Sequence, residues 1–298
     1  MKWFKLFCGF SLCVAVLATL SCSDGGGSSS TTAGSGIVTM SITDAKPMLP
    51  ANITAFKVKF DEVLVHKSGG GWISLPMAES PHIIDLLQFI DGDTTEFVPP
   101  VRLVSGKYTQ VRIVISEAWI TVSEGSDEIE YMVTIPSENL KTDKNFDFYV
   151  GDLTGVDEDS TGVDIIVDFD LSMSLKVENN TSPTTYTCKP VLHLAETKKA
   201  ATIVGHIDDA AFGDEDYAIV SVFVRDPDSS SYEEYTKIMV TNTASENPEL
   251  FTIFWLVPNK EYLVEITSEG TPVRAIDTID VGLLSEEQTY DLYEANEI

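Results

Sequence analysis

Apolar and polar side chains alternate with a period of two residues over much of the chain, most clearly at residues 162–194. The first part of this segment places Ile165, Val167, Phe169 and Leu171 on one face and Ile166, Asp168 and Asp170 on the other. The second part repeats the alternation from Tyr186 to Leu194. Such alternation is typical of a β-strand with one buried face. Residues 179–183, Asn-Asn-Thr-Ser-Pro, have turn chemistry, so we expect one long β-hairpin.

Shorter strand patterns flank this hairpin on both sides. Before it, strands are predicted at residues 37–45, 53–67, 72–75, 108–122, 129–135 and 145–150. After it, strands are predicted at residues 203–207, 218–225, 235–241, 250–256, 261–267, 273–281 and 289–293. Residues 81–89 fit either a strand or one helical turn, and no stretch shows sustained helical periodicity. Frequent short strands separated by turn residues predict an all-β protein.

The length predicts two domains in tandem, and the strand pattern predicts that both are β-sandwich-like. The chain has 298 residues, and single domains commonly span roughly 100–200 residues. A polar stretch, Glu-Thr-Lys-Lys-Ala at residues 196–200, separates a first domain at residues 37–196 from a second at residues 201–298. An apolar fraction of 43% is sufficient for a core in each.

The amino terminus is organised like a bacterial lipoprotein precursor. Lys2 and Lys5 precede an uncharged apolar run at residues 6–20, which is too short to span a bilayer and is typical of a secretory signal peptide. Ser21-Cys22 resembles the end of a lipobox, although Thr19 stands where Leu is usual. We expect residues 1–21 to be removed and Cys22 to be lipidated. Cleavage nearby as an ordinary signal peptide is the alternative.

Residues 22–36 are predicted to be a flexible linker behind the lipidated cysteine. They are rich in Gly and Ser and contain no large apolar side chain. A coil of this composition has a reach of about 20 Å. Ser23, and not Asp, follows Cys22, which resembles the sorting pattern for the outer membrane of a diderm bacterium. The predicted location is therefore the cell envelope, with the membrane bound through the lipid anchor.

The charge balance is strongly acidic, with 47 Asp and Glu against 19 Lys and Arg and a formal net charge of −28. Residues 202–298 alone carry 21 acids and four bases. Such a charge repels phosphate-rich partners, which argues against binding of nucleic acid and against direct adhesion to anionic lipid. Solubility explains the acidity most simply, while divalent cations or a cationic ligand are the alternatives.

The cysteines predict no intramolecular disulfide. Cys8 and Cys13 lie in the signal peptide, Cys22 is the lipidation site, and Cys188 is then alone. Cys188 lies on an apolar strand face, so we expect a buried, inert thiol.

Seven short motifs follow one another along the first domain. They are Ile-Thr-Asp-Ala at 42–45, Trp-Ile at 72–73, Ile-Asp-Leu-Leu at 84–87, Ser-Gly-Lys-Tyr-Thr-Gln-Val-Arg at 105–112, Ile-Pro-Ser at 135–137, Val-Asp-Phe-Asp at 167–170 and Lys-Pro-Val at 189–191. In this order they resemble domain-of-unknown-function family 4382, a bacterial lipoprotein domain. In this chain Lys46 interrupts Ala45 and Pro47, and Cys188 replaces a usual Leu. The resemblance implies a β-rich exported domain of unknown activity and supplies no catalytic residue.

Residues 251–266 resemble the signature of transthyretin-like sandwich modules, also called carboxypeptidase regulatory-like domains. Asn259-Lys260 stands where this signature has Gly. The resemblance implies a spacer or a binding module without catalytic activity.

An acidic loop, Asp157-x-Asp159-x-Thr161-Gly162 with Asp168 further on, resembles a calcium loop. Alternate oxygens can surround a hard cation, and Gly permits the sharp turn. However, Thr161 holds the fifth place, Asp168 replaces a bidentate Glu, and no helices are predicted on either side. A solvated acidic loop is the simpler interpretation, so we assign no metal site.

Paired carboxylates and tryptophans are the remaining candidates. Asp168 and Asp170 share one strand face, and two carboxylates can catalyse glycoside hydrolysis, but such a pair on a strand is usually exposed. Asp44 and Asp85 lie at strand ends, where turn or cap roles are commoner than ligation. Trp72, Trp119 and Trp255 fall in strand patterns, which favours core packing over a flat platform for a sugar.

These observations favour a lipid-anchored, non-catalytic binding or scaffolding protein of the cell envelope, with a carbohydrate or a protein as ligand. The sequence contains no Ser-His-Asp spacing, Cys-His cluster, phosphate-binding loop or dinucleotide fingerprint. We therefore expect no catalytic residue, no cofactor and no metal, and Cys22 is the site residue that we assign. The alternative is an envelope carbohydrate-active hydrolase that uses paired carboxylates.

Overall fold

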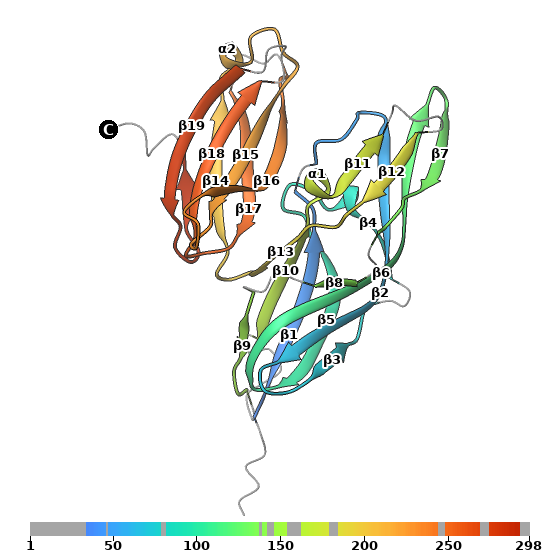
Figure 1. The fold of residues 1–298 in the computed structure, drawn as a ribbon, viewed down its shortest axis with the longest axis vertical. Helices are drawn as coiled ribbons and strands as arrows, with labels where there is room; N and C mark the ends of the chain where they lie inside the picture. The colour runs from blue at the N-terminus through green and yellow to red at the C-terminus, as the bar shows by residue number, and fades with distance from the viewer. Residues whose placement is uncertain are drawn as a thin grey trace, which may run out of the picture. The chain divides into compact units, whose positions relative to one another are not determined.

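The computed structural model describes residues 34–45, 47–78, 82–136, 139–141, 146–153, 162–178, 184–243, 248–268 and 274–292. These residues form an all-β fold (Figure 1), as the alternating pattern predicts. The signal peptide, Cys22 and most of the linker lie outside the described residues. Within the described ranges, no helix has the length and apolar composition needed to cross a bilayer.

The amino-terminal half contains thirteen strands and two helical turns among its described residues. The strands are β1 (Ser35–Thr43), β2 (Ile53–Lys67), β3 (Trp72–Leu75), β4 (His82–Asp85), β5 (Thr95–Val104), β6 (Gly106–Glu124), β7 (Asp127–Met132), β8 (Asn139–Lys141), β9 (Phe148–Val150), β10 (Val163–Phe169), β11 (Leu175–Glu178), β12 (Thr185–Cys188) and β13 (Leu192–Glu196). The turns are η1 (Leu86–Gln88) and α1 (Leu171–Ser174).

The carboxy-terminal half contains seven described strands and one helical turn. The strands are β14 (Ala201–Ile207), β15 (Tyr217–Arg225), β16 (Tyr232–Thr241), β17 (Glu249–Leu256), β18 (Glu261–Ser268), β19 (Arg274–Leu283) and β20 (Thr289–Asp291). The turn is α2 (Asp209–Phe212). All seven strands that the sequence predicts in this half are present.

Two sheets enclose the first hydrophobic core. One has the order β13-β10-β1-β5, with β1 and β10 parallel, and the other is built on the long pair β2 and β6. Alternate residues of both sheets fill the core, among them Met40, Phe60, Ile113 and Val167, all at 0% exposure. Burial of alternate residues on facing sheets is the arrangement of a β-sandwich.

The second core lies between the sheets β17-β14-β20 and β16-β15-β18-β19. It is a separate cluster, although Ala45 of the first half packs against it. Residues 33–298 nevertheless group into one compact unit. The division into domains at residues 196 and 201 therefore stays a prediction.

The long hairpin is present but interrupted. Strand β10 pairs with β13 and β11 pairs with β12, both antiparallel. The helical turn α1 separates β10 from β11, where continuous strand was expected. Strand β10 is also buried on both faces, because Ile165 to Phe169 are all buried. The single buried face that the alternation predicts is thus wrong for this strand.

Strand β5 is missing from the strands predicted by the sequence. It contains Pro99-Pro100, and proline removes a backbone donor from a ladder. Strand β5 is an edge strand, and two register shifts interrupt its pairing with β1. Proline is tolerated at sheet edges and bulges. The two prolines therefore obscure the strand pattern in the sequence, but the strand still forms. Residues 82–88 form both a short strand and a helical turn, which reconciles the two alternatives for that segment.

A buried tyrosine near the start of one strand in each half bonds back to a carbonyl four or five residues earlier in the chain. The hydroxyl of Tyr108 donates to the Val104 carbonyl at 2.9 Å, and that of Tyr262 donates to the Val257 carbonyl at 2.8 Å. Both side chains are at 0% exposure. Each hydroxyl therefore fixes the direction in which the chain enters its strand.

Replacement of Tyr262 by Phe removes this hydroxyl and leaves the ring in place. We expect the free energy of unfolding to fall by about 1–3 kcal/mol, because the Val257 carbonyl loses its donor. Urea unfolding followed by fluorescence measures the change. Tyr149→Phe is the matched control, since Tyr149 is 65% exposed. An equal loss in both variants would contradict the role assigned to Tyr262.

Candidate functional site

The carboxyl ends of β1 and β10 bring two sequence motifs together. These strands are parallel neighbours, and Thr43 lies opposite Asp168 in their register. Parallel strands end at the same edge of a sheet, so Asp44, which follows β1, comes close to Asp168 and Asp170. The motifs at residues 42–45 and 167–170 thus form one cluster, despite about 120 residues between them.

Two of these carboxylates bond reciprocally to the backbone that follows the opposite strand. Oδ1 of Asp44 accepts from the Leu171 amide at 3.0 Å, and Oδ1 of Asp168 accepts from the Ala45 amide at 3.1 Å. Amides beyond a strand end have no ladder partner, and a buried amide without a partner is costly. These two bonds therefore give a hydrogen-bond acceptor to one backbone amide beyond the end of each strand.

Asp170 begins the helical turn α1. Its Oδ1 accepts from the Met173 amide at 2.9 Å, which is a helix N-cap. The same turn is held by Ser174, whose Oγ accepts from the Val191 amide at 2.8 Å. This turn displaces the chain from β10 into β11 and thereby interrupts the hairpin.

All three aspartates are buried, at 0% exposure for Asp170, 1% for Asp44 and 6% for Asp168. Burial raises the pKa of the Asp168 carboxyl to about 7. Burial, followed by the charge of Asp168, raises the pKa of Asp44 well above its ordinary value. Oδ2 of Asp44 and Oδ2 of Asp170 are buried without a hydrogen-bond partner among the described residues.

His193 lies beside the cluster on β13, directly opposite Asp168 in the register of β10 and β13. Its Nε2 is 3.7 Å from Oδ2 of Asp170. The charge that His193 carries when protonated lowers the pKa of Asp168, in opposition to burial. On its other side His193 packs against Tyr235 of β16, with ring centroids 4.0 Å apart. This histidine therefore joins the carboxylates to the carboxy-terminal half.

A β-bulge in β17 directs two aromatic rings to the same place. Ala201 pairs with Leu256 and Ile203 with Ile253, so Phe254 and Trp255 together oppose one residue of β14. The backbone of Trp255 has φ 62°, an angle that residues other than glycine rarely adopt. The Phe254 ring packs closely against Gly92. A Cβ added to Gly92 would lie 3.0 Å from this ring, and the φ of Gly92 is +90°, so glycine suits the position.

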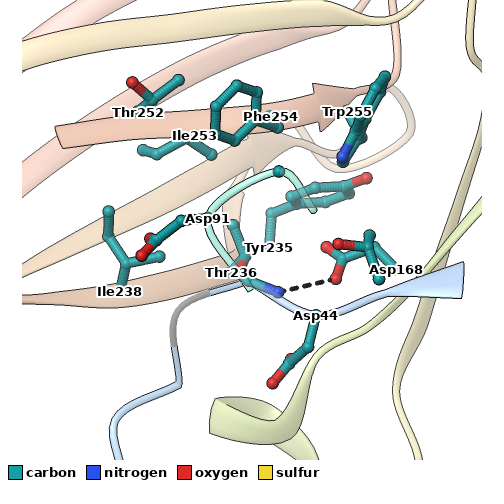
Figure 2. Close-up of a pocket in the computed structure, with 13 residues that line it drawn as sticks. Asp44, Asp91, Asp168, Tyr235, Thr236, Ile238, Thr252, Ile253, Phe254 and Trp255 are labelled. Carbon is teal, nitrogen blue, oxygen red and sulfur yellow. Dashed lines mark hydrogen bonds between the residues drawn. The ribbon is translucent and has the colours of Figure 1, made fainter. Parts of the chain in front are cut away.

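A cavity of about 20 Å³ lies at this junction. Figure 2 shows Asp44 and Asp168 on one side of it, with Tyr235, Phe254 and Trp255 opposite. Oγ1 of Thr236 and Nε1 of Trp255, from two other lining residues, are buried without a hydrogen-bond partner in the described part of the chain. The volume admits about one water molecule.

The family model described as "Domain of unknown function (DUF4382)" matches residues 35–190, which is more than half of the chain. The protein belongs to this family. No curated protein matches it. The predicted resemblance to that family is thereby confirmed, whereas no comparison identifies residues 251–266 as transthyretin-like.

Solved structures that are similar to this DUF4382 protein include the following three, and their TM-scores are low. A leucine-rich repeat protein from Bacteroides thetaiotaomicron has 10% identity and TM-score 0.21, with 87% of this chain and 26% of that chain covered. This protein thus spans about a quarter of that chain's length. The fimbrial anchor protein Mfa2 from Porphyromonas gingivalis has 10% identity and TM-score 0.20, with 83% of each chain covered. The major pilin from Streptococcus pyogenes has 7% identity and TM-score 0.17, with 87% and 99% covered. Such TM-scores support no argument about function.

In this DUF4382 protein, the structure changes some of the sequence-based assignments and agrees with others. Asp168 and Asp170 are not an exposed pair, because the second half and α1 cover their strand face. Asp44 accepts from the Leu171 amide, at the first residue of the turn α1. Asp85 precedes η1 but makes no side-chain cap hydrogen bond there, so the cap role expected of it is wrong; its Oδ1 accepts from the Phe56 amide of β2 at 3.0 Å. Cys188 is buried and its pKa is raised to about 12, as expected for an inert thiol.

The tryptophans do not pack in the core as expected. Trp72, Trp119 and Trp255 are all intermediate in exposure and are absent from the two buried clusters. Arg112 lies 4.2 Å above the Trp72 ring, which is a cation–π contact that occupies one face. Trp255 belongs to the bulge at the junction. Neither buried core packing nor an open platform describes Trp72 and Trp255.

Of the acidic loop that resembles a calcium loop, the structure describes Gly162 and Asp168. Asp157, Asp159 and Thr161 lie outside the described residues. Asp168 is buried, accepts a hydrogen bond from the Ala45 amide and lines the cavity at the junction. Its Oδ1 therefore serves the backbone and not a cation. Among the described residues, no group of three or more His, Cys, Asp and Glu side chains could hold a metal ion.

The raised pKa of Asp168 predicts a pH-dependent stability. The native state holds the neutral carboxyl up to about pH 7, whereas the unfolded state ionises near pH 4. This contribution is therefore fully present below pH 4 and is lost as the pH rises through 7. Relative to Asp168→Asn, we expect wild type to lose up to about 4 kcal/mol of unfolding free energy between pH 4 and pH 8.

Urea unfolding of both proteins at matched ionic strength measures this difference. Asp61→Asn is the control for loss of one acid at an exposed position. Parallel stability curves for wild type and Asp168→Asn between pH 4 and pH 8 would show that Asp168 is not the titrating group.

Proposed function

We propose that this DUF4382 protein is a lipid-anchored, non-catalytic binding or scaffolding protein of the bacterial cell envelope. The amino-terminal signal and Ser21-Cys22 support the anchor, and the Gly- and Ser-rich linker supports a folded part held near the membrane surface. The all-β fold of the described residues is compatible with this role.

The observation that carries the non-catalytic assignment is the use of the clustered carboxylates. Asp44, Asp168 and Asp170 each accept a hydrogen bond from a backbone amide that needs a partner in the folded protein. A general acid or nucleophile must instead reach a substrate atom. These three side chains are buried inside the junction, where they hold the ends of two strands.

The alternative, a carbohydrate hydrolase with paired carboxylates, fits this geometry poorly. Ligand pockets commonly have volumes of about 300–1,000 Å³, whereas the cavity beside Asp168 has a volume of about 20 Å³. A sugar ring would have to displace Tyr235 or the β17 bulge to reach Asp168.

An assay for hydrolysis tests the choice between the two functions. Purified protein is incubated with envelope polysaccharide, and new reducing ends are counted. We expect no release above the buffer blank, and the same result for Asp168→Asn. Release by wild type that is lost in Asp168→Asn would establish the hydrolase and overturn the proposal.

Replacement of Cys22 by Ala tests the anchor. We expect Cys22→Ala to abolish incorporation of radiolabelled palmitate and to move the protein from the membrane to the soluble fraction, because position 22 then has no thiol for lipid attachment. Cys188→Ala is the matched control and should leave labelling unchanged, since Cys188 is buried. Equal labelling of Cys22→Ala and wild type would rule out lipidation at this site.

A further inference from the structure

A groove lies beside His193 and Tyr235, which are among its lining residues. It has a volume of about 200 Å³ and is formed by β13 from the first half and by β15, β16 and β18 from the second. An adjoining hollow of about 390 Å³ shares Arg225, Pro227 and Lys260 with it. The lining is more apolar than polar, with Leu192, Leu194 and Val257 among its members. Apolar concavities with a few polar groups are typical ligand sites.

The groove brings together cations that are rare in this half. Residues 202–298 contain four bases against 21 acids, and two of the four, Arg225 and Lys260, line both hollows. Arg225 forms an ion pair with Glu261. Lys260 is half-buried, and no carboxylate among the described residues forms an ion pair with it. A lysine without a counter-ion in an acidic protein is available to an anion.

The acidic side chains that line the groove do not form an ion pair with Lys260 among the described residues. Asp226 accepts from the Asp228 amide at 2.9 Å and from the Ser229 hydroxyl at 2.6 Å, so its oxygens serve its own turn. Glu233 also lines the groove and is exposed. His193 and Tyr235 form an aromatic wall, and Tyr262 meets Tyr235 edge to face at 5.8 Å.

We propose that this groove binds a small organic carboxylate with an apolar body. The apolar body contacts the leucines and the aromatic wall, and the carboxylate head binds Lys260 with Arg225 beside it. This inference rests on the proposed binding role and specifies the chemistry of the ligand.

Isothermal titration calorimetry of the full chain tests this site with three probes. Phenylacetate has the body and the charge, phenylacetamide has the body alone, and acetate has the charge alone. We expect phenylacetate to bind at least tenfold more tightly than either of the others, since a charge-assisted bond and apolar burial are both required. Equal affinity for phenylacetate and phenylacetamide would overturn the proposal, and so would a lack of phenylacetate binding.

Lys260→Met keeps the length of the side chain and removes the charge. We expect phenylacetate affinity to fall about tenfold or more, with phenylacetamide unaffected. Lys176→Met is the control for the loss of one positive charge, because Lys176 is 73% exposed and lies outside the groove. Unchanged affinity in Lys260→Met, with an unchanged melting temperature, would place any binding elsewhere and overturn the proposal. Failure here would leave the tests of membrane anchoring and of hydrolysis intact.

Discussion

The reciprocal bonds at the ends of β1 and β10 hold the amino-terminal half in its observed form. Two parallel strands that end together expose backbone amides at one edge of a sheet, and in the interior each amide needs an acceptor. Asp44 and Asp168 supply those acceptors to the chain leaving the opposite strand. Asp170 then caps the turn that redirects β10 into β11. Loss of one carboxylate would leave both a buried amide and a distorted chain exit.

The two halves of the structure meet beside these carboxylates. His193 lies opposite Asp168 in the sheet and packs against Tyr235 of the second half. The β17 bulge places Phe254 against Gly92, and Ala45 packs against the second core. Burial at this junction raises the pKa values of Asp44 and Asp168. The junction is thus the place where a strongly acidic protein carries carboxyl groups that favour their neutral form.

The distribution of charge gives two neighbouring hollows different properties. Asp44 and Asp168 bond to the backbone and line a cavity with room for about one water molecule. A larger groove beside His193 is lined by apolar residues, Arg225 and Lys260. The clustered acids at the strand ends are therefore structural, and the scarce bases define the better candidate for binding.

The sequence by itself determined the elements and the class of the fold. Alternation of apolar residues predicts all seven strands of the second half, because a period of two follows directly from strand geometry. It also determined the family, since short motifs keep their order along the chain. It missed β5, whose prolines break the local pattern, and α1, whose polar residues read as a continuation of β10.

Only the tertiary structure decided which polar residues are buried together. Asp44 and Asp170 are far apart in sequence, and strand periodicity assigns Asp168 to a solvent face. The parallel pairing of β1 with β10 brings the three aspartates to one edge, and the second half then covers that edge. Likewise, the sequence shows Lys260 only as a lysine in a turn, and the structure places it in a groove with residues of β13 and β15. Long-range pairing sets burial and charge environment, and a local pattern of side chains carries no information about what will cover it.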